Sequence, residues 1–348
     1  MLENVTIIIP AHNRPERLAR LLEYYRGSGA QILVPDSSVE PFTGLTDEDT
    51  GVVYRHLPRM HFFLKLREVM GLIDRKYVLW VADDDFAIDE GIAACAEFLD
   101  ANPDYSCAQG HYLTFTPRRH DIQFTPRYIR NHDCRITDST AQERLRRQTG
   151  MYASMLYSLT RADIFRRIYS YVFNPDGTLR FTNLFLAEEF FNHAMLICGK
   201  YATLPVFFSA RERIAGSATE TTVPASVIKN SEQYRPEYEG FIRALTLLLS
   251  DTSGMPANQA EDLMRRLSHA PADKPSIIFK RRVNALLNST PLLRWAARLS
   301  EWRYHSKGLR AVRHLPSYPC TTPTPARTRH ESHIRKTTKS TPNSRLKR

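Results

Sequence analysis

Three consecutive carboxylates, Asp83, Asp84 and Asp85, follow the apolar run of residues 77–82. The run favours a strand buried on both faces of a parallel sheet. Adjacent carboxylates repel each other and are costly to bury, so a positive partner is expected beside them. If the chain stays extended, Asp83 and Asp85 point the same way and could hold Mg²⁺ or Mn²⁺ together. The alternative is a solvated acidic turn that caps a helix from Ile88.

A second acidic pair, Glu188 and Glu189, lies in LFLAEEFFNHAMLICG, residues 184–199. The apolar spacing of this segment predicts an amphipathic helix that a glycine ends. Carboxylates near a helix N-terminus are stabilised as anions by the macrodipole, which alone is enough to explain the pair.

The elements that would position these acids alternate along the chain. Apolar and β-branched runs predict strands, and helical spacing predicts the helices between them. The expected strands are 5–10, 31–34, 52–56, 77–82, 106–116, 151–159 and 203–208. The expected helices are 17–25, 61–73, 88–101, 161–171 and 184–199, and residues 236–302 are mostly helical in pattern. Residues 116–147 are irregular, and FTPR occurs twice, beginning at Phe115 and at Phe124, which we interpret as two arms of a hairpin or lid. The pattern is typical of an open α/β sheet, in which ligands bind beyond the carboxyl ends of the strands.

The polar residues at that edge are the candidate site. They are His12, Asn13, Asp36, Ser38 and the three aspartates. Asn13 is expected to cap the next helix, and Pro15 to begin it. Lys65, on the helix before the aspartates, either contacts a phosphate or lies on a solvated helix face.

The composition of the chain limits the classes of partner and the cellular compartment that we expect. The net charge is +11, and residues 303–348 contain 12 Lys/Arg and one acid, so the remainder is neutral. A nucleic-acid partner is therefore not expected. The tail is predicted to be disordered, and it either contacts an anionic membrane surface or has no specific role. The five scattered cysteines lack a CxxC pair and fit a reducing cytoplasm. No signal peptide and no apolar run of about 20 residues is found, so no membrane span is expected.

Four segments, in this order, resemble the motifs of inverting family-2-type glycosyltransferases with the GT-A fold. They are VTIIIPAHNRPERLARLLEYY, QILVPDSS, YVLWVADDDF with its DxD motif, and LAEEFFNHAMLICGKYATLP. The resemblance covers roughly residues 4–215. It implies a Rossmann-like, open, mostly parallel sheet flanked by helices. We expect a glycosyltransferase domain at 1–225, a helical C-terminal extension at 226–304 and a disordered basic tail at 305–348.

The resemblance also implies roles for single residues. Asp36 corresponds to the acid that contacts the nucleotide base, and Glu189 to the catalytic base, with Glu188 as the alternative. The metal ligands would be Asp83 and Asp85. The other nucleotide-binding positions are Pro10, His12, Asn13, Lys65, Asp83 and Asp84. The chain departs from the family in having only Asp36 after the second strand, and Lys65 and Arg67 in place of an Asn-x-Gly.

The implied reaction is metal-dependent, inverting hexosyl transfer from a nucleotide-diphosphate sugar, with UDP favoured and Mn²⁺ or Mg²⁺ as cofactor. The acceptor would be a hydroxyl of a glycan, lipid-linked or protein molecule in surface polysaccharide or glycoconjugate synthesis. The expected location is the cytoplasm, with peripheral contact at the inner face of the membrane. The alternative is a non-catalytic protein of this fold that binds a nucleotide-sugar, a glycan or a partner protein. A nucleotidyltransferase is disfavoured because AHNRPER contains no phosphate-binding glycine.

Overall fold

The computed structural model describes residues 1–117, 122–127, 134–150, 154–212 and 222–268. The predicted basic tail, and residues 269–304 of the predicted helical extension, lie outside the described residues. No helix in the described ranges is both long enough and apolar enough to cross a bilayer.

The described strands form one ten-stranded sheet in the order β3-β2-β1-β4-β9-β6-β10-β5, with β7 beside β6 and β8 beside β10. Their bounds are β1 (Val5–Ile8), β2 (Gln31–Asp36), β3 (Val52–His56), β4 (Tyr77–Trp80), β5 (Asp85–Ala87), β6 (Tyr105–Pro117), β7 (Ile122–Arg127), β8 (Arg135–Ile136), β9 (Leu159–Arg161) and β10 (Lys200–Glu212).

The main strands run in one direction. Strands β1, β2, β3 and β4 pair in parallel, as do β6 and β10. Strand β9 is antiparallel to both β4 and β6, so these two strands also run the same way. The expected open, mostly parallel sheet is confirmed, and the carboxyl ends of the main strands therefore share one edge.

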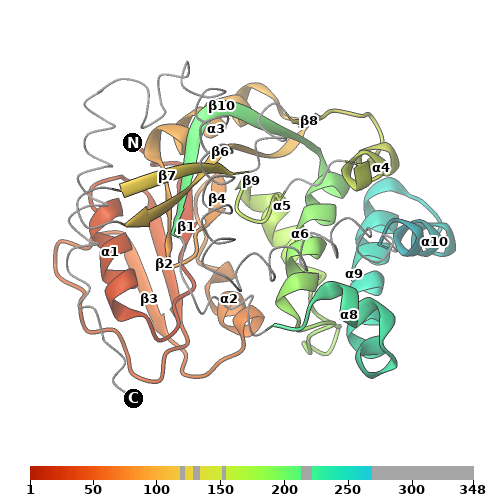
Figure 1. The fold of residues 1–348 in the computed structure, drawn as a ribbon, viewed down its shortest axis with the longest axis horizontal. Coiled ribbons are helices and arrows are strands. Elements are labelled where there is room, and N and C mark those ends of the chain that lie inside the picture. Colours follow the sequence, from red (N-terminus) through yellow and green to blue (C-terminus); the bar gives the residue numbers. More distant parts are fainter. Residues whose placement is uncertain (118–121, 128–133, 151–153, 213–221, 269–348) are drawn as a thin grey trace, which may run out of the picture.

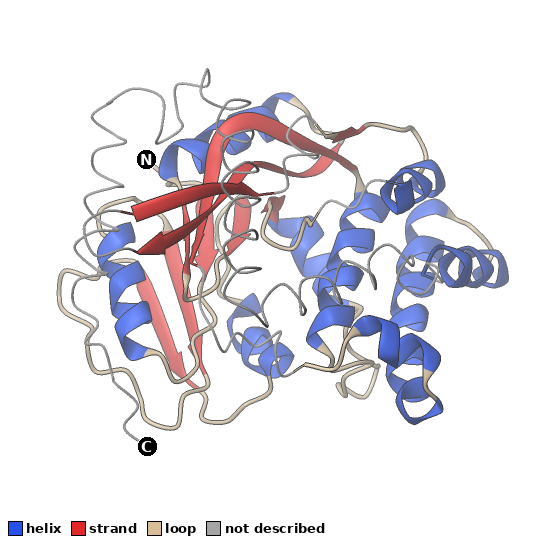
Figure 2. Cartoon of the chain, viewed as in Figure 1, coloured by secondary structure: helices blue, strands red, loops and turns tan. Residues whose placement is uncertain are grey.

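Helices cover both faces of the sheet (Figures 1 and 2). Their bounds are α1 (Pro15–Tyr25), α2 (Phe62–Met70), α3 (Asp89–Ala101), α4 (Ala141–Gly150), α5 (Ala162–Ser170), α6 (Leu184–Cys198), α8 (Ala225–Asn230), the short 3₁₀ turn η2 (Glu232–Tyr234), α9 (Arg235–Ser253) and α10 (Ala257–Ser268). Because side chains alternate along a strand, β1 sends Ile7 into the core under α1 and α3, and Ile8 into the core under α2, α5 and α6.

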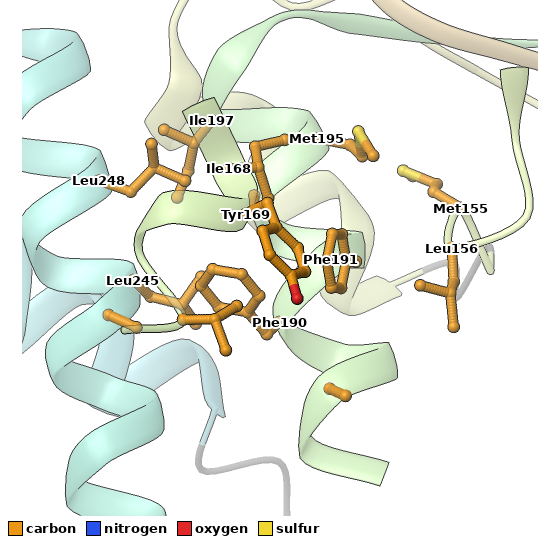
Figure 3. Packing of buried hydrophobic residues seen from close by; sticks show 14 of the residues in the cluster. Met155, Leu156, Ile168, Tyr169, Phe190, Phe191, Met195, Ile197, Leu245 and Leu248 are labelled. Atoms are coloured by element: carbon orange, nitrogen blue, oxygen red, sulfur yellow. The ribbon is translucent and has the colours of Figure 1, made fainter. Parts of the chain in front are cut away.

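Helix α6 lies within the core that also contains α2 and α5. The side chain of Asn183 caps it by accepting hydrogen bonds from the backbone N–H groups of Phe185 and Leu186. Nearly every residue after Glu189 in this helix is buried, because α6 packs against α9, α4 and α5. Figure 3 shows part of this packing, with labelled residues Met155, Leu156, Ile168, Tyr169, Phe190, Phe191, Met195, Ile197, Leu245 and Leu248. The described part of the C-terminal extension thus shares its core with the sheet domain.

Two expectations about residues 116–159 need revision. The two FTPR arms do pair as a hairpin, with Phe115 opposite Phe124. Residues 141–150, however, form helix α4, for which a capping box is present in the sequence. Thr140 and Glu143 exchange hydrogen bonds between their side chains and backbone N–H groups.

The strand expected at 151–159 is also shorter than predicted. Residues 151–153 lie outside the described residues, residues 154–158 form a turn, and β9 begins only at Leu159. Side chains tie this turn down, since Asn192 accepts from the backbone N–H of Met155 and Ser158 donates to Gln109. These bonds replace the ladder that a strand would have made.

Candidate functional site

A pocket of about 260 Å³ opens at the carboxyl ends of β1 and β2. It is lined by Ala11, Asn13, Arg14, Pro15, Leu18, Asp36, Ser38, Val39, Glu40, Pro41 and Phe42. The pocket therefore lies at the edge of the sheet where the sequence predicted the site. Pro10 and His12, which the resemblance places under a nucleotide, belong to the same loop but do not line the pocket.

Asn13 joins the two loops that form the pocket. Its backbone N–H donates to the Ser38 hydroxyl over 2.7 Å, and its side-chain oxygen accepts from Val39 N–H over 3.0 Å. Asn13 adopts a left-handed conformation, φ 53°, which asparagine tolerates better than most residues. The expectation that Asn13 caps α1 is wrong, since Arg14 holds the N-cap position without a side-chain cap, whereas Pro15 begins the helix as predicted.

Asp36 lines the pocket and is buried. One carboxylate oxygen, Oδ1, accepts from the backbone N–H of Ser38 over 2.8 Å and from its hydroxyl over 2.5 Å. The other, Oδ2, accepts from the Tyr54 hydroxyl over 2.9 Å. These bonds fix the orientation of the carboxylate relative to the pocket.

Lys65 is buried beneath the pocket. Its ammonium donates to the backbone oxygen of Ala11 over 2.6 Å and to the Ser37 hydroxyl over 3.0 Å. Burial lowers its pKa to about 8, although the negative charges of Asp36 and Asp83 oppose the shift. Lys65 therefore does not lie on a solvated helix face. It connects the β1–α1 loop to the loop after β2.

This buried charge predicts a pH-dependent stability. The folded-state pKa of Lys65 lies near 8 and the reference value is 10.5, so between these values the unfolded chain binds more protons and the free energy of unfolding rises with pH. Lys65→Met removes this contribution, which corresponds to about 3 kcal/mol over that window. Urea unfolding at several pH values measures it, with the exposed Lys76→Met as the control. Parallel pH profiles for wild type and Lys65→Met would contradict the prediction.

The aspartates do not alternate as expected. Strand β4 ends at Trp80, and the chain then turns before β5 begins at Asp85. In consequence Asp83 and Asp84 share one guanidinium, with Arg14 Nη1 at 2.9 Å from Asp83 Oδ1 and 3.3 Å from Asp84 Oδ2. Asp85 instead binds Arg211 Nε over 2.9 Å, across the β5–β10 pair. The positive partners that the acidic run demanded are these two arginines.

Burial dominates the electrostatics of this acidic run. It raises the pKa of Asp83, against the charge of Arg14, and it raises the pKa of Asp85 to about 7, against the charge of Arg211. Carboxylate oxygens suit Mg²⁺ or Mn²⁺, and Asp83 with Asp84 already surround one cationic group. Asp83 and Asp85, the expected pair of ligands, contact different arginines in the structure, Arg14 and Arg211. Within the described ranges, no group of three or more metal-ligating side chains is assembled.

Adjacent glutamates of α6 have different surroundings. Glu188 Oε1 accepts from the Ser154 hydroxyl over 2.9 Å. Its charge acts on Tyr157, whose pKa is raised mainly by burial and whose ring lies under Arg211, the partner of Asp85. Glu189 Oε1 pairs with Lys229 over 2.6 Å, and the same ammonium donates to the backbone oxygen of Ser268 at the end of α10. Glu188 therefore lies on the side of Ser154 and Tyr157, whereas Glu189 lies on the side of the C-terminal helices.

Sequence reasoning missed Arg14, Tyr54 and Arg211 as members of the site. The signal for Arg14 was present, because Arg14 directly precedes the helix that begins at the predicted ligand edge. Tyr54 and Arg211 are brought in by strand pairing, β2 with β3 and β10 with β5, which no local pattern reveals.

Comparison with known proteins gives a likeness of fold. No protein-family model matches the sequence, and no curated protein matches it in sequence. The crystal structure of S. aureus TarS 1–349 in complex with UDP-GlcNAc is similar at a TM-score of 0.51 and 13% identity, over 97% of this chain and 91% of that one. The crystal structure of S. aureus TarS is similar at a TM-score of 0.50 and 12% identity, over 97% of this chain and 55% of that one. At such low identity the similarity establishes the fold.

Proposed function

We propose that the protein transfers a sugar from a nucleotide-diphosphate sugar, preferably a UDP-sugar, to an acceptor hydroxyl. The observation that carries the proposal is the position of Arg14. It lines the pocket together with Asp36 and also binds Asp83 and Asp84, so it connects the pocket to the acidic run. The fold-level likeness to TarS, which was crystallised with UDP-GlcNAc, supports a donor of this class.

In this proposal the nucleoside occupies the pocket and the diphosphate extends toward Arg14. Asp36 is an acceptor-only group that lines the pocket, where it can receive an N–H from a base. Arg14, which also lines the pocket, is a planar guanidinium, and such groups bind phosphate oxygens well. Lys65 and Asn13 hold the two loops in place and do not need to touch the donor.

Asp83 and Asp84, whose carboxylates share the Arg14 guanidinium in the structure, would hold a divalent ion, Mn²⁺ or Mg²⁺. When bound, it would supply neutralisation of the charge that develops on the leaving diphosphate. Asp85, which the resemblance implies as a ligand, pairs with Arg211 in the structure.

Glu188 is proposed as the general base. It removes the proton of the acceptor hydroxyl while the hydroxyl oxygen forms a bond to the anomeric carbon and the bond from that carbon to the diphosphate breaks. Attack from the face opposite the diphosphate inverts the anomeric centre. The resemblance favours Glu189, but in the structure the Glu189 carboxylate is paired with Lys229 on the side of the C-terminal helices. The acceptor is a hydroxyl of a glycan, lipid-linked or protein molecule, as in surface polysaccharide synthesis.

A ligand panel tests the proposal. UDP at 100 times its Kd should raise the free energy of unfolding by about 2.7 kcal/mol. Arg14→Gln should weaken UDP binding measured without metal, whereas Arg26→Gln, which removes an arginine paired with Glu23 and Asp49, should not. Sugar release from UDP-sugars with Mn²⁺ is then followed in the same preparations. Absence of binding by every nucleoside diphosphate contradicts the proposal, and binding without sugar transfer favours a non-catalytic nucleotide-sugar-binding protein.

A further inference from the structure

One hydroxyl connects two walls of the pocket. Tyr54 donates to Asp36 Oδ2 over 2.9 Å and accepts from the backbone N–H of Phe42 over 2.7 Å. The rings of Phe42 and Tyr54 are also in contact, with centroids 6.4 Å apart. Burial is the main cause that raises the pKa of Tyr54 to about 12, so the hydroxyl keeps its proton at neutral pH. Tyr54 itself comes from β3, the strand beside β2.

The hydrogen bonds of Asp36 leave part of the hydrogen-bond-accepting capacity of its carboxylate unused. A carboxylate offers about four lone-pair positions and donates nothing. In the described part of the chain, Ser38 supplies two donors to Oδ1 and Tyr54 supplies one to Oδ2. One acceptor position on Oδ2 therefore stays available, and its direction is set by the Tyr54 hydroxyl on the same atom.

We propose that Tyr54 is a positioning residue for base selection, which holds Asp36 with one acceptor presented to the base and holds the Phe42 wall against it. The consequence is a preference for uracil over cytosine. Uracil presents an N–H at ring position 3, whereas cytosine presents a lone pair there, which an acceptor-only carboxylate repels. The two bases have nearly the same size, so pocket volume does not confound the comparison. This inference rests on the proposed function, because it requires a nucleoside in the pocket.

The experiment compares the Kd values of UDP and CDP by calorimetry in three proteins. Wild type should bind UDP at least about tenfold more tightly than CDP. Tyr54→Phe keeps the ring and removes the hydroxyl, so UDP affinity should fall about three- to tenfold with CDP affinity unchanged. Tyr171→Phe is the matched control, because Tyr171 also donates to an aspartate, Asp251. That hydrogen bond is exposed, and neither residue lines the pocket. The Tyr171→Phe variant should leave both affinities unchanged.

A second variant keeps the test decisive if Tyr54→Phe folds poorly. Asp36→Asn replaces the acceptor-only group by an amide that can also donate, so the UDP preference should disappear. A wild-type protein that binds both nucleotides equally, or a Tyr54→Phe protein with an unchanged UDP-to-CDP ratio, overturns the inference while the proposed function stands. Failure of wild type to bind either nucleotide overturns both.

Discussion

Glu188→Gln is expected to lower the rate of sugar transfer by about 10²- to 10⁴-fold, the usual contribution of a general base, with UDP affinity unchanged. Glutamine preserves the size of the side chain and can still accept from the Ser154 hydroxyl, so the fold should be kept. It cannot take a proton from the acceptor. The measurement is kcat with a competent donor and acceptor, together with the Kd of UDP.

The neighbouring Glu189→Gln is the matched control, because it changes the same atoms one residue further along α6. It should retain transfer, and it should lower stability modestly because Lys229 loses its ionic partner. The opposite pattern, with transfer lost in Glu189→Gln and kept in Glu188→Gln, would assign the base to the residue that the resemblance favours.

Gly240→Ala is expected to destabilise the protein by about 3 kcal/mol or more, a value at the upper end for overpacking. A Cβ at Gly240 would lie 1.7 Å from the backbone oxygen of Arg180, and neither backbone can yield easily. This contact seats α9 against the segment before α6, where Phe181 and Phe241 meet edge to face. The free energy of unfolding from urea titration measures the effect.

Gly71→Ala provides the control for this substitution. Gly71 follows α2 with a φ of −71°, and a Cβ there meets nothing within 4 Å. The variant should therefore be at least as stable as wild type, because alanine restricts the unfolded chain. Equal stabilities of Gly240→Ala and Gly71→Ala would mean that α9 can move away from Arg180 without loss.

The architecture was accessible from the sequence because it depends on local signals. The β-branched run that forms β1 and the apolar run that forms β4 each determine a buried strand, and Pro15 and Gly199 mark helix boundaries. The edge of the sheet that carries the pocket followed from strand direction. The prediction of strand 151–159 failed because its apolar pattern is satisfied by a turn held by side chains of other elements.

Details of the site depended on geometry that no local pattern encodes. The alternation argument for Asp83 and Asp85 required an extended chain, and the turn after Trp80 removes that condition. The location of Lys65 depends on how closely α2 approaches the ends of β1 and β2. Similarly, Glu188 and Glu189 are chemically equivalent in the sequence, and their different partners, Ser154 and Lys229, come from segments distant in the chain.

That separation gives the start of α6 a strict register. Successive residues of a helix are rotated by about 100°. The adjacent residues Glu188 and Glu189 therefore point in different directions, and Glu189 contacts the C-terminal helices through Lys229. The number of residues between the Asn183 cap and Glu188 is consequently as constrained as their identity. A deletion of one residue there would bring Glu189 to the place where Glu188 meets Ser154, and an insertion would bring Ala187 there, without altering any atom of the pocket.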